Sequence, residues 1–125
     1  MATLCLTSVL LTACGVTEEM LATRESAIVM MEEGNYEGAV AAFNGLVENA
    51  KKVTEFELDI LKYRAEAEFL LEDYEAALHT YHTLMEVDKE RPEYCYVSVM
   101  ALANLGRMSD AEEMLDAGVK LDKNL

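Results

Sequence analysis

The chain has 125 residues, of which 10 are Lys or Arg and 24 are Asp or Glu, so its formal net charge is −14. A chain of this length has room for one small domain, and its negative charge repels the phosphates of nucleic acids and the headgroups of anionic lipids. We therefore expect neither nucleic-acid binding nor attachment to a membrane through a basic surface.

The N-terminal element is an apolar run from Leu4 to Leu11, which ends in Leu11-Thr12-Ala13-Cys14-Gly15. This run is too short to span about 30 Å of hydrocarbon, but it has the length of the core of a cleavable signal. The segment resembles a bacterial lipoprotein signal, in which Leu, a small or β-branched residue and Ala or Gly precede Cys. The usual basic start is missing, and the alternative is a buried apolar segment that happens to end in Cys.

This resemblance implies a leader at residues 1–13, a lipid-bearing Cys14 as the first residue of the mature chain, and a short linker at residues 14–19. It also implies a location in the cell envelope, on the extracytoplasmic side of a bacterial membrane, where a multiply acylated cysteine anchors stably. Since Cys5 would be removed, Cys95 is left alone, and its apolar helical surroundings favour core packing over a reactive or metal-binding role.

After Gly15 the sequence is typical of helices, with a single Pro and no sustained alternation of polar and apolar residues. Gly34 and Gly106 are placed to end helices, and Thr54 and Ser109 begin patterns typical of capping boxes. The pair Asn44-Gly45 favours a turn and predicts a bend or fraying in the second helix. Helices are predicted near residues 18–33, 36–49, 54–71, 74–86, 92–105 and 109–121.

A motif recurs along these helices, with Ala39, Ala77 and Ala111 each followed four residues later by Phe43, Tyr81 and Leu115. The last two copies are 34 residues apart, and the first linker has four additional residues. The pattern resembles the tetratricopeptide repeat family, which implies an all-α fold, a right-handed α-solenoid of three helix-turn-helix repeats at residues 20–53, 54–91 and 92–125. The small residues Ala27 and Ala65 lie where the two helices of a repeat approach closely.

The same resemblance implies a peptide-binding groove lined by the first helix of each repeat. Carried over position by position, the groove mixes apolar and aromatic side chains with scattered charge. The family's clamp for a terminal carboxylate is not matched, so recognition of such a tail is not expected. The predicted groove residues are Arg24, Ile28, Lys62, Tyr63, Glu66, Phe69, Tyr96 and Met100.

Two histidines, His79 and His82, are spaced to share one helix face. A weak metal site with nearby carboxylates is conceivable, but the repeat pattern places both on the outer, convex side, and two exposed histidines are the favoured interpretation. We expect no catalytic residues, no cofactor and no metal site.

At the C-terminal end, Val119 and Leu121 are candidates for exposure, because no capping helix follows the third repeat in this sequence. Self-association or docking there, and a truncated gene model, are alternatives of equal weight.

Together these patterns predict a membrane-anchored, non-enzymatic interaction module of the bacterial cell envelope, whose partner is a protein or peptide. The first alternative is an accessory subunit of an envelope biosynthetic or transport assembly that uses its C-terminal end. A distant third is a small metal-dependent enzyme built on His79 and His82.

Overall fold

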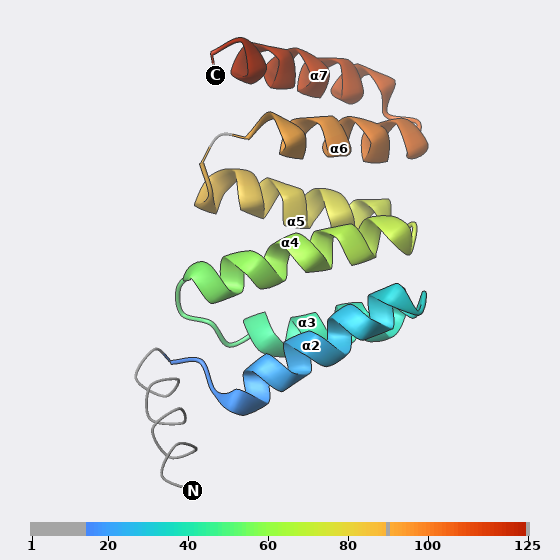
Figure 1. Cartoon of the computed structure of the whole chain (residues 1–125). Coiled ribbons are helices and arrows are strands. Elements are labelled where there is room, and N and C mark those ends of the chain that lie inside the picture. Colours follow the sequence, from blue (N-terminus) through green and yellow to red (C-terminus); the bar gives the residue numbers. More distant parts are fainter. Residues whose placement is uncertain (1–14, 90, 125) are drawn as a thin grey trace, which may run out of the picture.

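The computed structural model describes residues 15–89 and 91–124, and they form an all-α fold. The helices pack as antiparallel pairs, each against the next along the chain, with α2 at one end of the stack and α7 at the other (Figure 1). In sequence order they are α2 (Glu18–Glu32), α3 (Tyr36–Val47), α4 (Glu55–Leu70), α5 (Tyr74–Val87), α6 (Pro92–Asn104) and α7 (Met108–Lys123).

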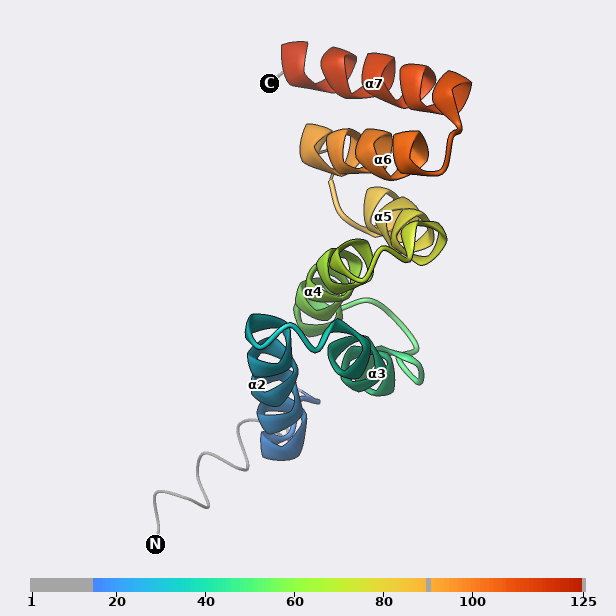
Figure 2. The ribbon, with the colours of Figure 1, turned by 90° about the vertical axis from the view of Figure 1, so that its right-hand side faces the viewer.

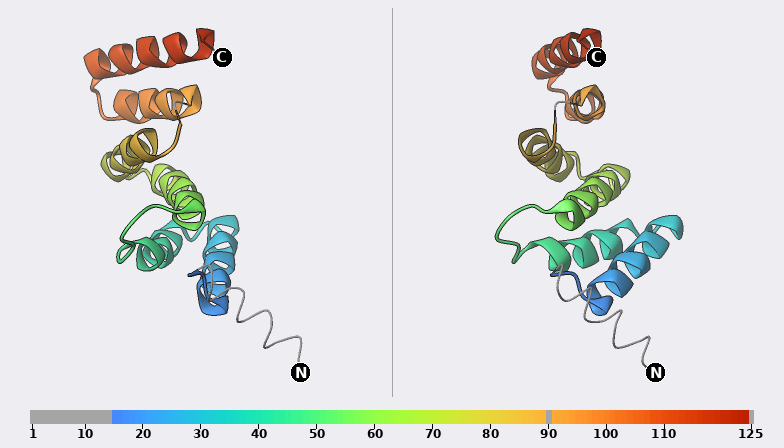
Figure 3. Two further views of the ribbon diagram at one scale, coloured as in Figure 1. Left: turned by 90° about the vertical axis from the view of Figure 1, so that its left-hand side faces the viewer. Right: turned by 60° about the vertical axis from the view of Figure 1, so that its left-hand side comes forward.

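The predicted helices are confirmed, with ends that differ by at most two residues. Side views show that successive pairs are turned relative to one another, so that the stack twists along its length (Figures 2 and 3). The limits assigned to the three repeats stay predictions, and the leader and Cys14 lie outside the described residues. None of the helices in the described part of the chain is long and apolar enough to cross a bilayer.

The three turns between paired helices share one geometry. Gly34, Glu72 and Gly106 have positive φ angles of 81°, 66° and 76°. In each turn the next amide donates to a carbonyl five residues earlier, as Asn35 does to Met30 at 2.7 Å. This left-handed ending is common at helix C-termini and favours Gly, yet the middle turn uses Glu72. The repeat is therefore built into the backbone as well as the sequence.

The residue after each turn caps the second helix in two repeats. The side chains of Asn35 and Asp73 accept hydrogen bonds from the amides three residues later, at 3.0 and 3.3 Å. In the third repeat this position is Arg107, which makes no such cap. The expected capping box at Ser109 is wrong, because the turn geometry starts α7 at Met108, one residue before that serine.

Two other local predictions have different outcomes. The capping box at Thr54 is confirmed, since the Glu57 carboxylate accepts from the Thr54 amide at 3.0 Å. The expected bend at Asn44-Gly45 is wrong: α3 continues through both residues to Val47. Packing of the apolar face of α3 against its neighbours outweighs the weak helix preference of one Gly.

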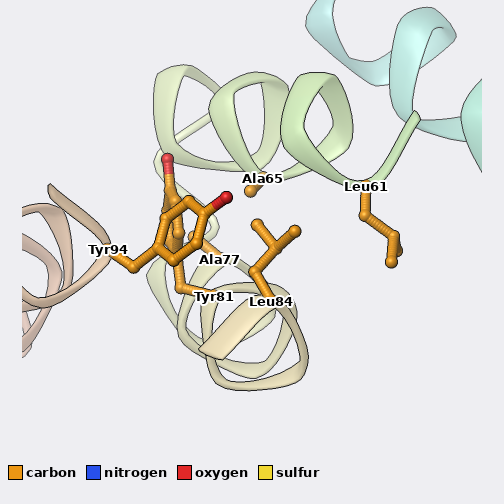
Figure 4. Packing of buried hydrophobic residues seen from close by; sticks show 6 residues of the cluster. All are labelled: Leu61, Ala65, Ala77, Tyr81, Leu84 and Tyr94. Atoms are coloured by element: carbon orange, nitrogen blue, oxygen red, sulfur yellow. The ribbon is translucent and has the colours of Figure 1, made fainter. Parts of the chain in front are cut away.

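Small alanines allow the helices to pack closely. Ala27, Ala39, Ala65 and Ala77 are fully buried, and Ala111 is buried as well. Around them lie two clusters of apolar residues, one between α2, α3 and α4 and the other between α4, α5 and α6. Figure 4 shows the second cluster, in which the residues are Leu61, Ala65, Ala77, Tyr81, Leu84 and Tyr94.

Candidate functional site

A groove of about 520 Å³ lies between α4 and α6, with α5 at its base. Its apolar lining consists of Phe69 and Leu70 from α4, Tyr81 and Leu84 from α5, and Tyr94, Val97 and Met100 from α6. At the base Leu84 is fully buried and Tyr81 nearly so, and Tyr94 on the α6 wall is also nearly buried. The rings of Tyr81 and Tyr94 lie next to each other, with 6.2 Å between their centroids (Figure 4). Leu70 and Met100, in contrast, are 44% and 49% exposed at the rim.

Asp88 links the helices around this groove. Its side chain is only 9% exposed. The carboxylate accepts hydrogen bonds from the Tyr94 hydroxyl at 2.6 Å and from Arg91 Nε at 2.9 Å, and it lies 3.8 Å from Lys62 Nζ. The hydrogen bond from Tyr94 is the largest cause that lowers the pKa of Asp88 to about 2, with smaller contributions from the Lys89 amide and Arg91. The two basic residues that line the groove therefore already face an ionised carboxylate of the same chain.

Half of the predicted groove residues line this groove. Lys62, Glu66 and Phe69 lie on α4 and Met100 on α6, as the repeat pattern implies. The structure shows that these four side chains line the same groove. Their role in binding stays a prediction.

Arg24, Ile28 and Tyr63 lie elsewhere. Arg24 donates to Asp59 at 2.6 Å and stacks over the ring of Tyr63, 5.2 Å from its centroid. Tyr63 also stacks on the buried Phe43. These side chains join α2 to α4, and Ile28 packs against the same cluster. A cation and a ring that pair in this way attract each other, and a role of these residues in binding stays a prediction.

Tyr96 faces the opposite side of α6 from the groove. Its hydroxyl donates to Asp122 in α7 at 2.9 Å, and this bond raises the pKa of Tyr96.

Several groove residues were not predicted from the sequence. They are Glu93, Tyr94 and Val97 on the α6 wall, and Tyr81 and Leu84 at the base. A helical signal was present: Glu93, Val97 and Met100 repeat the spacing of Lys62, Glu66 and Phe69, which places each set on one helix face.

A buried polar cluster lies on the other side of α4. The Glu68 carboxylate, 6% exposed, accepts from the Thr80 hydroxyl at 2.6 Å and lies 3.9 Å from Arg64 Nε. Burial raises the pKa of Glu68, against the lowering effects of Thr80 and Arg64. Arg64 in turn donates to Asn44 at 3.1 Å and so connects α3, α4 and α5. All these groups point away from the groove lining, and the cluster holds the two core clusters in register.

The two histidines line a different depression, of about 610 Å³, between α5, α6 and α7. His82 lies 3.2 Å from the Glu86 carboxylate, and both side chains are exposed. Among the residues that the structure describes, no group of three His, Cys, Asp or Glu side chains could hold a metal ion. Val119 is exposed, as predicted, whereas Leu121 is half-buried, and Cys95 is buried.

Comparison with known proteins places the chain among regulators. Residues 8–124 match the family model described as bacterial transcriptional activator domain. Among solved structures, the type III secretion translocator chaperone SycD of Yersinia enterocolitica, in an alternative dimer, is similar with a TM-score of 0.69 and 19% identity, over 86% of this chain and 79% of that chain. At this identity the likeness concerns the fold, which confirms the repeat architecture. No curated protein matches the chain.

The family match overturns the predicted function and location. It begins at residue 8, inside the expected leader, and includes Cys14, so cleavage there would cut into the matched domain. Bacterial transcription takes place in the cytoplasm, so an anchored envelope module and an envelope accessory subunit are both wrong. The expectations of a non-enzymatic chain and of protein partners are confirmed, because the family is a domain of transcriptional activators.

Proposed function

The chain belongs to the bacterial transcriptional activator domain family, and from this we propose that it is the part of a cytoplasmic transcriptional activator that contacts another protein. The observation that carries the proposal is the match over residues 8–124, which covers nearly all of the described fold. The domain's role in transcription is to bind a protein and thereby recruit or hold it.

The charge of the chain favours protein over DNA as the direct partner. DNA-binding surfaces place several Lys or Arg side chains against phosphates, but this chain has a net charge of −14. Its Arg24, Lys62 and Arg91 each lie within 4 Å of a carboxylate of the same chain. In this proposal DNA is bound not by this domain but by another segment of the activator or by another protein.

The contact surface that we propose is the groove between α4 and α6. It combines a buried base with exposed apolar side chains at its rim, Leu70 and Met100. Large apolar side chains in a pre-formed hollow contribute most of the binding free energy at typical interfaces. Of the residues predicted from the repeat, we retain Lys62, Glu66, Phe69 and Met100 for this role.

The proposal can be tested by artificial recruitment. The full chain is fused to an unrelated DNA-binding domain whose operator lies upstream of a reporter gene in bacteria. We expect the fusion to raise reporter transcription above the DNA-binding domain alone, and Leu70→Asp with Met100→Asp to abolish the increase. The matched control is Met108→Asp with Leu115→Asp, because these side chains are 58% and 45% exposed and lie outside the groove. A fusion that fails to raise transcription would refute the proposed function.

A further inference from the structure

The charges around the groove are of two kinds. The cations Lys62 and Arg91 face the ionised carboxylate of Asp88, at 3.8 and 2.9 Å. They belong to the linkage that holds α4, α5 and α6 together. Asp88 offsets one of these two positive charges, and an incoming anion would have to compete with it. With Glu66 and Glu93 included, these groups have two positive and three negative charges, so their sum is −1.

The acidic residues at the rim are different. Glu66 on α4 and Glu93 on α6 are both exposed and both line the groove. Within the described residues neither carboxylate has an ion-pair partner within 4 Å or a side-chain hydrogen bond. They lie on opposite walls, so a chain segment in the groove passes between two carboxylates that form no ion pair among the described residues.

The size of the groove limits the length of its occupant. On α4 the lining extends from Lys62 to Leu70, which is about 12 Å along a helix axis. This length matches about two turns of a helix, or about four residues of an extended strand. One or two apolar side chains can reach the base in such a segment, with their neighbours at the rim.

We propose that the groove takes a segment of a partner protein in which apolar side chains are flanked by Lys or Arg, the apolar groups contacting Phe69 and Met100 and the cations pairing with Glu66 and Glu93. This inference rests on the proposed function and names the chemistry of its partner. The net charge of −14 acts in the same direction, because it attracts a basic segment and repels an acidic one or a second copy of this chain.

The test begins with selection of peptides from a random 12-residue display library on the full chain. We expect the selected peptides to combine Leu, Phe or similar residues with Lys or Arg. A fluorescein-labelled synthetic copy of the strongest binder is then titrated by anisotropy. Because exposed ion pairs each contribute modestly and are screened by salt, we expect affinity to fall about tenfold in Glu66→Lys with Glu93→Lys, and also to fall at high salt in the wild type.

The matched control is Glu48→Lys with Glu112→Lys, which makes the same change of charge at two exposed positions outside the groove. It should weaken binding much less. Equal weakening in the two double variants, selected peptides without basic residues, acidic peptides, or a library that yields no binder would each overturn the inference. If Met100→Asp abolishes binding while the Glu66 and Glu93 changes do not, only the charge preference fails. If Met100→Asp leaves peptide binding unchanged, the groove is not the binding site. The proposed function is tested separately, because it is refuted only if the fused chain fails to raise reporter transcription.

Discussion

Two glycines inside helices allow one substitution to be compared in two surroundings. A Cβ added at Gly45 in α3 would have no heavy atom within 4 Å. At Gly118 in α7 it would lie 2.8 Å from the Cε1 atom of Tyr96 and 2.9 Å from the Cβ atom of Cys95. The same change to Ala therefore adds helix preference at both positions but creates a clash at only one.

The expected free energies follow from these distances. Ala is favoured over Gly in a helix by about 0.8–1.0 kcal/mol, so Gly45→Ala should raise the free energy of unfolding by about 0.5–1 kcal/mol. At Gly118 the Cys95 Cβ atom is attached to the backbone of α6, and the Tyr96 hydroxyl is held by Asp122 at 2.9 Å. The helices must separate, and such overpacking costs about 1–3 kcal/mol. After deduction of the helix gain we expect Gly118→Ala to lose up to about 2 kcal/mol, whereas Gly45→Ala gains stability.

Urea denaturation followed by far-UV circular dichroism measures both changes. One kcal/mol corresponds to about 4 °C in Tm for a domain of about this size, so thermal unfolding provides a second measurement. A Gly118→Ala protein that gains as much stability as Gly45→Ala would show that close approach of α6 and α7 does not depend on this glycine. Destabilisation by Gly45→Ala would contradict the open surroundings found at that position.

Three further variants or measurements test other features. Glu72→Gly should raise the free energy of unfolding by about 0.5–1 kcal/mol in urea denaturation, because φ at Glu72 is 66° and Gly adopts this conformation without strain. The control is Glu33→Gly, at a residue with φ of −84°, and this change should lower the free energy of unfolding. Because the pKa of Asp88 is lowered from 3.8 to about 2, its contribution to stability is present above pH 3.8 and is lost as the pH falls towards 2. The difference in free energy of unfolding between wild type and Asp88→Asn should therefore disappear over this interval in acid titrations. A difference that stays constant would contradict the lowered pKa. Burial raises the pKa of Cys95, which is 3% exposed, so peptide mass spectrometry should find slow alkylation by iodoacetamide in the native protein and fast alkylation in urea, whereas equal rates would rule out a buried thiol.

Most of the fold could be predicted because its signals are local. The alanines of the repeat are buried wherever the motif places them, and Gly34 and Gly106 end helices with the left-handed backbone that favours glycine. The equivalent turn at Glu72 has no such signal and followed only from the repeat. The start of α7 was missed for the reverse reason: Ser109 has a local capping pattern, but the turn geometry shared with the other repeats places the start at Met108.

The candidate site was predicted only in part, because a groove depends on which face each helix presents. On α4, the predicted Lys62, Glu66 and Phe69 line this groove, whereas the predicted Tyr63 does not. On α6, the predicted Met100 lines the groove together with Glu93 and Val97, whereas the predicted Tyr96 contacts Asp122 in α7. The base of the groove, Tyr81 and Leu84, belongs to α5 and depends on how three helices meet, which no spacing within one helix reveals.

The wrong function came from the least constrained part of the sequence. A signal that consists of an eight-residue, mainly apolar run and a Cys contains few positions, and the sequence left open the alternative of a buried apolar segment. The net charge, in contrast, is a property of the whole chain, and the absence of nucleic-acid binding stays a prediction. A net charge of −14 disfavours contact with DNA, and this is consistent with membership of an activator family if the domain contacts protein. Artificial recruitment separates these two roles directly, since a foreign DNA-binding domain supplies the DNA contact and leaves only the protein contact to this chain.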